Sequence, residues 1–160
     1  MTTTLDRFKE AQAEPRSGFD AALSEIRSGG KRGHWIWYVF PQLAGLGHSS
    51  ASRAYGIDGA AEAYKYLRDP LLRSRLVTIA SAVADQLARG VPLGLLMGSS
   101  IDATKLVSSM TLFGNVARQL HATEGLEEYA TLARVADEIL VGAAGAGFEK
   151  CEFTLERLRG

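Results

Sequence analysis

The sequence is poor in the features that mark secreted and membrane-bound proteins. Its 160 residues include one cysteine, Cys151, so no disulfide can form within the chain and a reducing, cytoplasmic location is favoured. No apolar run approaches the ~20 residues that a membrane-spanning helix needs, and the N-terminus lacks the pattern of a secretory signal. We therefore expect a soluble cytoplasmic protein that has no membrane partner.

An excess of charge of one sign is also lacking. The 18 basic residues balance the 18 acidic ones, so the net charge is +0 and nothing suggests binding to nucleic acid. His34, His48 and His121 have no Cys, Asp or Glu at zinc-ligand spacing, so no metal site is predicted. Phosphate-binding loops, nucleophile elbows and dinucleotide-binding glycine motifs are missing as well, so the sequence names no cofactor.

The chain does have helical periodicity. Its clearest amphipathic stripe consists of Leu72, Leu76, Ile79, Ala80, Val83 and Leu87. Further helices are expected over residues 98–120 and 126–140, and a chain of this length most often forms one domain. We predict an all-α fold, a compact multi-helix bundle in which residues 1–141 form a single domain. Residues 142–147 would be a mobile Gly/Ala linker, and residues 148–160 a tail that docks back on the bundle.

Both tryptophans lie in residues 33–42, a stretch that we call the aromatic hub. A strand would suit its β-branched and aromatic residues, whereas a helix would be apolar nearly all round and hence buried. Because no convincing second strand exists, we favour a short buried helix that ends before Pro41. The hub would be either plain core or a platform on which Trp35 or Trp37 stacks a ring while His34 or Gln42 fixes its edge.

Two segments place a glycine and two serines just ahead of a predicted helix. Ser49 and Ser50 form one pair, and Ser99 and Ser100 form the other. Free N–H groups at a helix N-terminus, together with hydroxyls, can bind an anion. Serine is also an ordinary N-cap residue, so the pattern fits either a phosphate site or simple capping.

The helix after residue 98 carries an unusual set of polar groups. Asp102, Lys105 and Ser109 fall on one face and border the apolar stripe. A carboxylate, an amine and a hydroxyl beside a pocket could perform acid–base or sugar-hydroxyl chemistry. A half-exposed Asp–Lys pair, with serine bonded back to its own helix, would instead be structural.

These patterns define the candidate site residues. The catalytic candidates are Asp102, Lys105 and His34. The ligand-binding candidates are Trp35, Trp37, Gln42, Ser49, Ser50, Tyr55, Ser99, Ser100 and Ser109.

Several of these motifs resemble those of a known family. They are His34-Trp35-x-Trp37-x-x-Phe40-Pro41-Gln42, Gly45-Leu46-Gly47 and Asp102-x-x-Lys105-Leu106-x-Ser108-Ser109-Met110-Thr111-Leu112-Phe113. They resemble the uncharacterised bacterial domain-of-unknown-function family 1810, over residues 5–120 and more weakly to 158. The resemblance implies a small, mostly helical cytoplasmic domain and no established reaction. The label "calpastatin", sometimes given to members, does not fit, because this chain is apolar enough to fold.

Two functions remain open. The first is binding or hydrolysis of an anionic, nucleotide-like or ADP-ribose-like small molecule, which requires the hub and the helix of Asp102 to line one cavity. The alternative is a non-catalytic structural or protein-partner-binding module, in which the polar motifs are caps and supporting hydrogen bonds. The sequence does not decide whether the protein is an enzyme. The alanine-rich faces of the last helices could pack in a homodimer.

Overall fold

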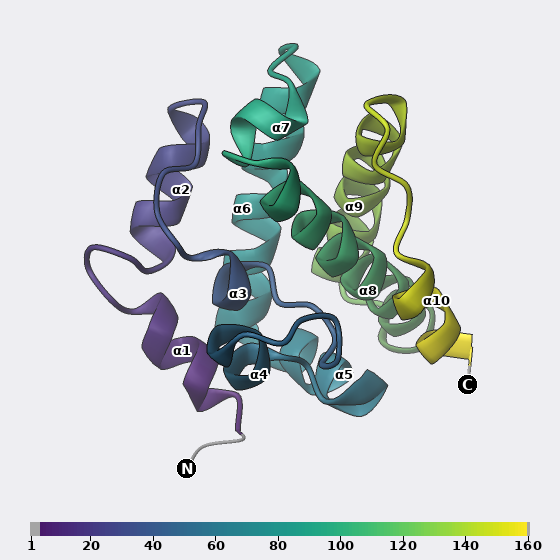
Figure 1. The fold of residues 1–160 in the computed structure, drawn as a ribbon. Helices are drawn as coiled ribbons and strands as arrows, with labels where there is room; N and C mark the ends of the chain where they lie inside the picture. The colour runs from purple at the N-terminus through teal and green to yellow at the C-terminus, as the bar shows by residue number, and fades with distance from the viewer. Residues whose placement is uncertain (1–3, 160) are drawn as a thin grey trace.

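A computed structural model describes residues 4–159 and contains ten α-helices in this range. No strand occurs among the described residues, where a single parallel bridge joins Leu43 to Ile57, so the all-α prediction is confirmed. In the same range, no helix is both long and apolar enough to cross a membrane. The helices, shown in Figure 1, are α1 (Asp6–Gln12), α2 (Phe19–Arg27), α3 (Ile36–Val39), α4 (Ser50–Tyr55), α5 (Gly59–Arg68), α6 (Pro70–Ala88), α7 (Leu93–Leu96), α8 (Ser100–Glu124), α9 (Glu127–Gly145) and α10 (Glu152–Arg159).

Three long helices, α6, α8 and α9, form the scaffold. Helix α9 packs against both α6 and α8, while α2 lies on α6 and α5 lies on α8 (Figure 1). The sequence sets their ends: Asp69 accepts hydrogen bonds from the backbone N–H groups of Leu71 and Leu72 at the start of α6. At its far end, α8 stops at Gly125, whose φ of 73° suits glycine.

The centre of the bundle is an aromatic core. Phe8, Trp35, Phe40, Tyr66 and Phe113 are all at most 1% exposed. The ring centroids of Tyr66 and Phe113 lie 4.9 Å apart, and those of Phe8 and Tyr66 lie 5.2 Å apart in an edge-on arrangement. Helices α1, α5 and α8 are thus joined through one cluster of rings.

The aromatic hub is helical, as the lack of a partner strand suggested. Helix α3 makes a single turn, and the chain leaves the helical region at Phe40, the residue before Pro41. The hub then runs into the short bridge to Ile57, where the Ile57 N–H donates to the Gln42 carbonyl at 2.9 Å. This bridge sets α4 against α3.

Residues 142–147 differ from the mobile linker that their composition suggested, because α9 continues through Gly145. Alanine is the strongest helix former, and Ala143 is fully buried, so packing holds the helix despite its glycines. After a short connection, α10 packs on α8 and α5, with Thr154 fully buried. The Cys151 N–H donates to Thr111 Oγ1 of α8 at 3.4 Å.

Candidate functional site

The first half of the hub is tied into the fold through Trp35. This side chain is fully buried, and its Nε1–H donates to Glu25 Oε1 at 3.0 Å. The same oxygen accepts the backbone N–H groups of Arg32 at 2.7 Å and Gly33 at 2.8 Å. Burial acts to raise the pKa of Glu25, but these hydrogen bonds, with the charge of Lys31, hold the pKa below its ordinary value. Ionised Glu25 therefore anchors the segment that enters the hub.

Lys31 lies beside this anchor, and its side chain is only 5% exposed. Its Nζ is 2.7 Å from Asp102 Oδ2, donates to the Gly33 carbonyl and lies 4.9 Å from the Trp35 ring centroid. Sequence reasoning missed both Lys31 and Glu25, because neither belongs to a motif. The only available signal was a lysine just ahead of the hub in a glycine-rich segment.

The second half of the hub repeats this arrangement with one difference. Lys105 Nζ lies 4.9 Å from the centroid of the Trp37 ring and 3.8 Å from Asp102 Oδ1. Trp37 Nε1 is buried, yet among the described residues it has no hydrogen-bond acceptor. The hydroxyl of Ser109, one turn after Lys105 on α8, is likewise buried and unpartnered within residues 4–159.

A small cavity lies where the hub, α4 and α8 meet. Its volume of about 10 Å³ is close to the minimum for one water-sized group. Four residues predicted from the sequence line it together, namely Trp37, Gln42, Tyr55 and Lys105, with Ser52 and Ala51 from α4. The hub and the Asp-x-x-Lys helix therefore line one cavity. In this structure the cavity is far too small to hold a nucleotide.

The structure places the remaining predicted residues elsewhere. His34 is exposed, as are Ser50 and Ser100. Ser49 Oγ accepts the Ser52 N–H at 3.1 Å and caps α4, and Ser99 Oγ accepts the Asp102 N–H at 3.1 Å and caps α8. Each capping serine thus serves its own helix.

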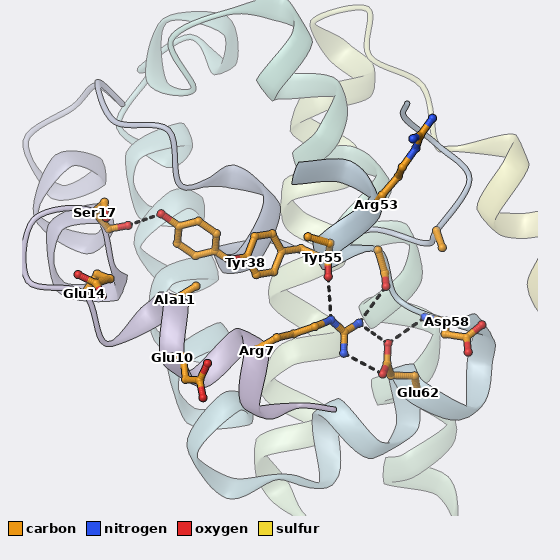
Figure 2. A pocket seen from close by; sticks show the side chains of 13 residues that line it. Arg7, Glu10, Ala11, Glu14, Ser17, Tyr38, Arg53, Tyr55, Asp58 and Glu62 are labelled. Carbon is orange, nitrogen blue, oxygen red and sulfur yellow. Dashed lines mark hydrogen bonds and ion pairs between the residues drawn. The ribbon is translucent and has the colours of Figure 1, made fainter. Parts of the chain in front are cut away.

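A larger hollow, with a volume of about 940 Å³, opens beside α1, α4 and α5 (Figure 2). Its floor is a two-point ion pair: Arg7 Nη2 lies 2.7 Å from Glu62 Oε1, and Arg7 Nη1 lies 3.1 Å from Oε2. Burial raises the pKa of Glu62, but the hydrogen bonds and charge of Arg7 outweigh it and lower that pKa below its ordinary value. This hollow was not predicted, because its residues come from segments without a shared motif.

Two tyrosines form the wall of this hollow. The centroids of the Tyr38 and Tyr55 rings are 5.2 Å apart, and the Tyr38 hydroxyl donates to the Ser17 carbonyl at 2.5 Å (Figure 2). Burial raises the pKa of Tyr38, and the charge of Glu14 acts in the same direction. In residues 4–159, no group of three or more His, Cys, Asp or Glu side chains could hold a metal ion.

The fold and the motifs together describe a small all-α domain with a His-Trp-x-Trp hub beside an Asp-x-x-Lys helix. The family model described as "Protein of unknown function (DUF1810)" matches residues 2–137, so the chain belongs to this family and the resemblance of its motifs is confirmed. The crystal structure of the conserved hypothetical protein Rv1873 from Mycobacterium tuberculosis is similar, with 33% identity and a TM-score of 0.70. The match covers 95% of this chain and 94% of that one. No curated protein matches the chain.

Proposed function

We propose that this protein binds a small anionic molecule where the hub meets α8, with Lys105 and the indole N–H of Trp37 as the recognising groups. The observation that carries the proposal is the buried Trp37 Nε1, which lacks an acceptor in residues 4–159 while an ammonium group lies over the same ring. A buried donor left unpaired costs about 1–3 kcal/mol. A ligand oxygen that accepted this hydrogen bond would recover that free energy.

The charges around Asp102 support an anion rather than a cation. Two lysines face this one carboxylate, and Lys31 is the closer partner, at 2.7 Å against 3.8 Å for Lys105. Lys105 is therefore the less closely paired of the two lysines, and its side chain is 21% exposed. Attraction between charges is stronger in such a partly buried place than in water.

The size of the cavity limits how a ligand would enter. It has room for about one oxygen atom, so the rest of the molecule would lie outside or displace part of the wall. Helix α4 supplies Ala51, Ser52 and Tyr55 to the wall and has no buried residue, so it is the part of the wall that a ligand would displace, at the cost of the Tyr38–Tyr55 contact and the Arg7 hydrogen bond to the Ala54 carbonyl. A nucleotide-like or ADP-ribose-like molecule would place one phosphoryl oxygen at Lys105 and its larger parts beyond α4. We propose binding rather than hydrolysis, because Lys31 already holds Asp102.

The competing function is a structural or protein-partner-binding module without a small-molecule site. Ser49 and Ser99 favour it, since each is fully used as a helix cap, and so does Trp35, which is buried on Glu25. In this case the polar groups of the hub would stabilise the fold and nothing else. The two functions differ in the role of Lys105, which binds the ligand in the first and only stabilises the fold in the second.

A thermal-shift series tests the proposal. The wild type, Lys105→Met and the control Lys150→Met, an exposed lysine between α9 and α10, would be melted with inorganic phosphate, nucleotides or ADP-ribose at constant ionic strength. A ligand of the folded state raises the melting temperature by mass action, so we expect a rise in the wild type and the control but not in Lys105→Met. An equal rise in all three proteins, or no rise with any probe, would contradict the proposal.

A further inference from the structure

Residues 44–56, which we call the α4 loop, are closed at their base by backbone hydrogen bonds. The Ala44 N–H donates to the Ile57 carbonyl at 2.9 Å, and the Ile57 N–H donates to the Gln42 carbonyl at 2.9 Å. These two bonds hold the ends of the loop together, and α4 lies between them. Compact surface loops with joined ends are frequently functional. The base of the α4 loop thus forms a natural hinge.

The α4 loop is the least anchored part of the wall around the small cavity. None of residues 44–56 is buried, whereas every helix other than α4 in the described range buries at least one side chain. Yet α4 covers the cavity with Ala51, Ser52 and Tyr55. Segments with few buried contacts open at the lowest free-energy cost. This side of the cavity should therefore open before any other.

One arginine of α1 holds the far end of the α4 loop. Arg7 Nε donates to the Ala54 carbonyl at 3.0 Å, and Arg7 Nη2 donates to the Gly56 carbonyl at 3.0 Å. Glu62 fixes the same guanidinium, with Oε1 at 2.7 Å from Nη2 (Figure 2). Glu62 Oε1 also accepts the Asp58 N–H at 2.9 Å, which ties the chain just after the loop to the same carboxylate. The side chains of Arg7 and Glu62 are 10% and 13% exposed, so water competes little with these bonds.

We infer that the α4 loop is a lid over the anion site and that Arg7, fixed by Glu62, is the clamp that keeps this lid closed. The inference rests on the proposed function for what binds beneath the loop. Tyr55, a wall residue of the cavity, lies between the two carbonyls that Arg7 holds, so the loop opens only when these hydrogen bonds break. A ligand that needs the open loop binds only the fraction of molecules in which the clamp is released. Weakening the clamp should therefore strengthen binding.

The variant Arg7→Lys tests the clamp. A lysine keeps the charge but lacks the planar fork of donors that reaches two carbonyls and a carboxylate at once. The control Arg68→Lys makes the same replacement in an ion pair between α5 and α8, where Arg68 donates twice to Glu124. A loss of binding through mere damage to an arginine pair would appear in both variants.

Amide hydrogen exchange of the free protein, followed by nuclear magnetic resonance, measures the opening itself. Helix α4 has six residues and is not stable alone, so its amides exchange whenever the loop opens. In the wild type we expect these amides to exchange faster than the hinge amides of Ala44 and Ile57. Arg7→Lys should accelerate α4 exchange about fivefold, the effect of losing about one hydrogen bond, and Arg68→Lys should leave it unchanged.

Binding of ADP-ribose, measured by isothermal titration calorimetry, is the second readout. Its affinity for Arg7→Lys should rise by the same factor as the exchange of α4, because both follow one opening equilibrium. Arg68→Lys should bind like the wild type. A purely structural role of Arg7 would instead leave the affinity unchanged or lower it.

The outcomes separate this inference from the proposed function. Unchanged α4 exchange in Arg7→Lys would overturn the lid and leave the anion site to its own test. Faster exchange without a gain in affinity would also overturn the inference, because opening would then not lead to the site. No binding of ADP-ribose or inorganic phosphate by the wild type or by Arg7→Lys would overturn the proposed function, and with it the role of the α4 loop as a lid.

Discussion

Trp35 and Trp37 lie two residues apart, and each has a lysine ammonium 4.9 Å from its ring centroid. Both lysines reach the same carboxylate, Asp102. Trp35 is fully buried and donates to Glu25, whereas Trp37 is half-buried and its N–H has no acceptor among the described residues. The two halves of the hub therefore differ in one hydrogen bond: the Trp35 indole is paired within the fold, whereas the Trp37 indole lacks an acceptor in the described part of the chain.

The largest expected effect is on the stability of the Trp35 half. Trp35→Ala should lower the free energy of unfolding by about 3–5 kcal/mol, because it empties a buried site and leaves Glu25 without the indole donor. Trp37→Ala should cost clearly less, about 1–2 kcal/mol, because this ring is half-buried and loses no hydrogen bond. Urea unfolding of the two variants measures the difference. An equal loss of unfolding free energy in the two variants would contradict the difference between the two halves of the hub.

The two lysines should differ in the same way as the two tryptophans: replacing Lys31 should cost more stability than replacing Lys105. Lys31→Met should destabilise the protein by about 2 kcal/mol, because it removes the closer partner of Asp102 from a place where Lys31 is only 5% exposed. Lys105→Met should change stability by no more than about 0.5 kcal/mol, because its contact with Asp102 is long and partly exposed. The same urea series measures both, and a larger loss for Lys105→Met would show that this lysine is structural.

Glu25 gives the Trp35 half a pH dependence. Its pKa is lowered from 4.5, so the stability it contributes is present above pH 4.5 and is lost as the pH falls through the lower pKa of the folded state. Glu25→Gln should therefore cost about 1–2 kcal/mol at neutral pH, and the gap to the wild type should narrow below pH 4.5. Unfolding at several pH values tests this, with Glu127→Gln on the exposed face of α9 as the control. A gap that stays constant with pH would contradict the role given to the ionised carboxylate.

The smallest effects concern the helix caps that the sequence offered as ligand-binding groups. Ser99→Ala and Ser49→Ala should each cost about 1 kcal/mol, the usual value for a lost N-cap. Neither should change the response to phosphate in the thermal-shift series. A lost response in either variant would move the anion site to that helix N-terminus and away from Trp37.

The sequence was sufficient for the elements that local patterns encode. Helical spacing predicted the stripe of α6, and the missing partner strand predicted a short helix in the hub that ends before Pro41. The motif residues Trp37, Gln42, Tyr55 and Lys105 do line one cavity, although their roles remain proposals.

The residues that sequence reasoning missed owe their positions to tertiary contacts. Glu25 accepts from Trp35 only because α2 and the following loop fold back over the hub, and Lys31 meets Asp102 across the start of α8. Arg7 and Glu62 pair through α1 and α5 in the same way. No periodicity or spacing encodes such pairs. Residues 142–147 show the converse, since packing against the bundle extended a helix that their composition had suggested would be a linker.

The most direct test of the central claim is the nuclear magnetic resonance of the two indole N–H groups. The chain has two tryptophans, so a ¹⁵N–¹H correlation spectrum shows two indole signals, which Trp37→Phe assigns. During titration with inorganic phosphate at constant ionic strength, the signal of Trp37 should move and saturate, while that of Trp35, held on Glu25, should stay in place. A Trp37 signal that never moves, or that moves no more than that of Trp35, would contradict an anion site at the second half of the hub.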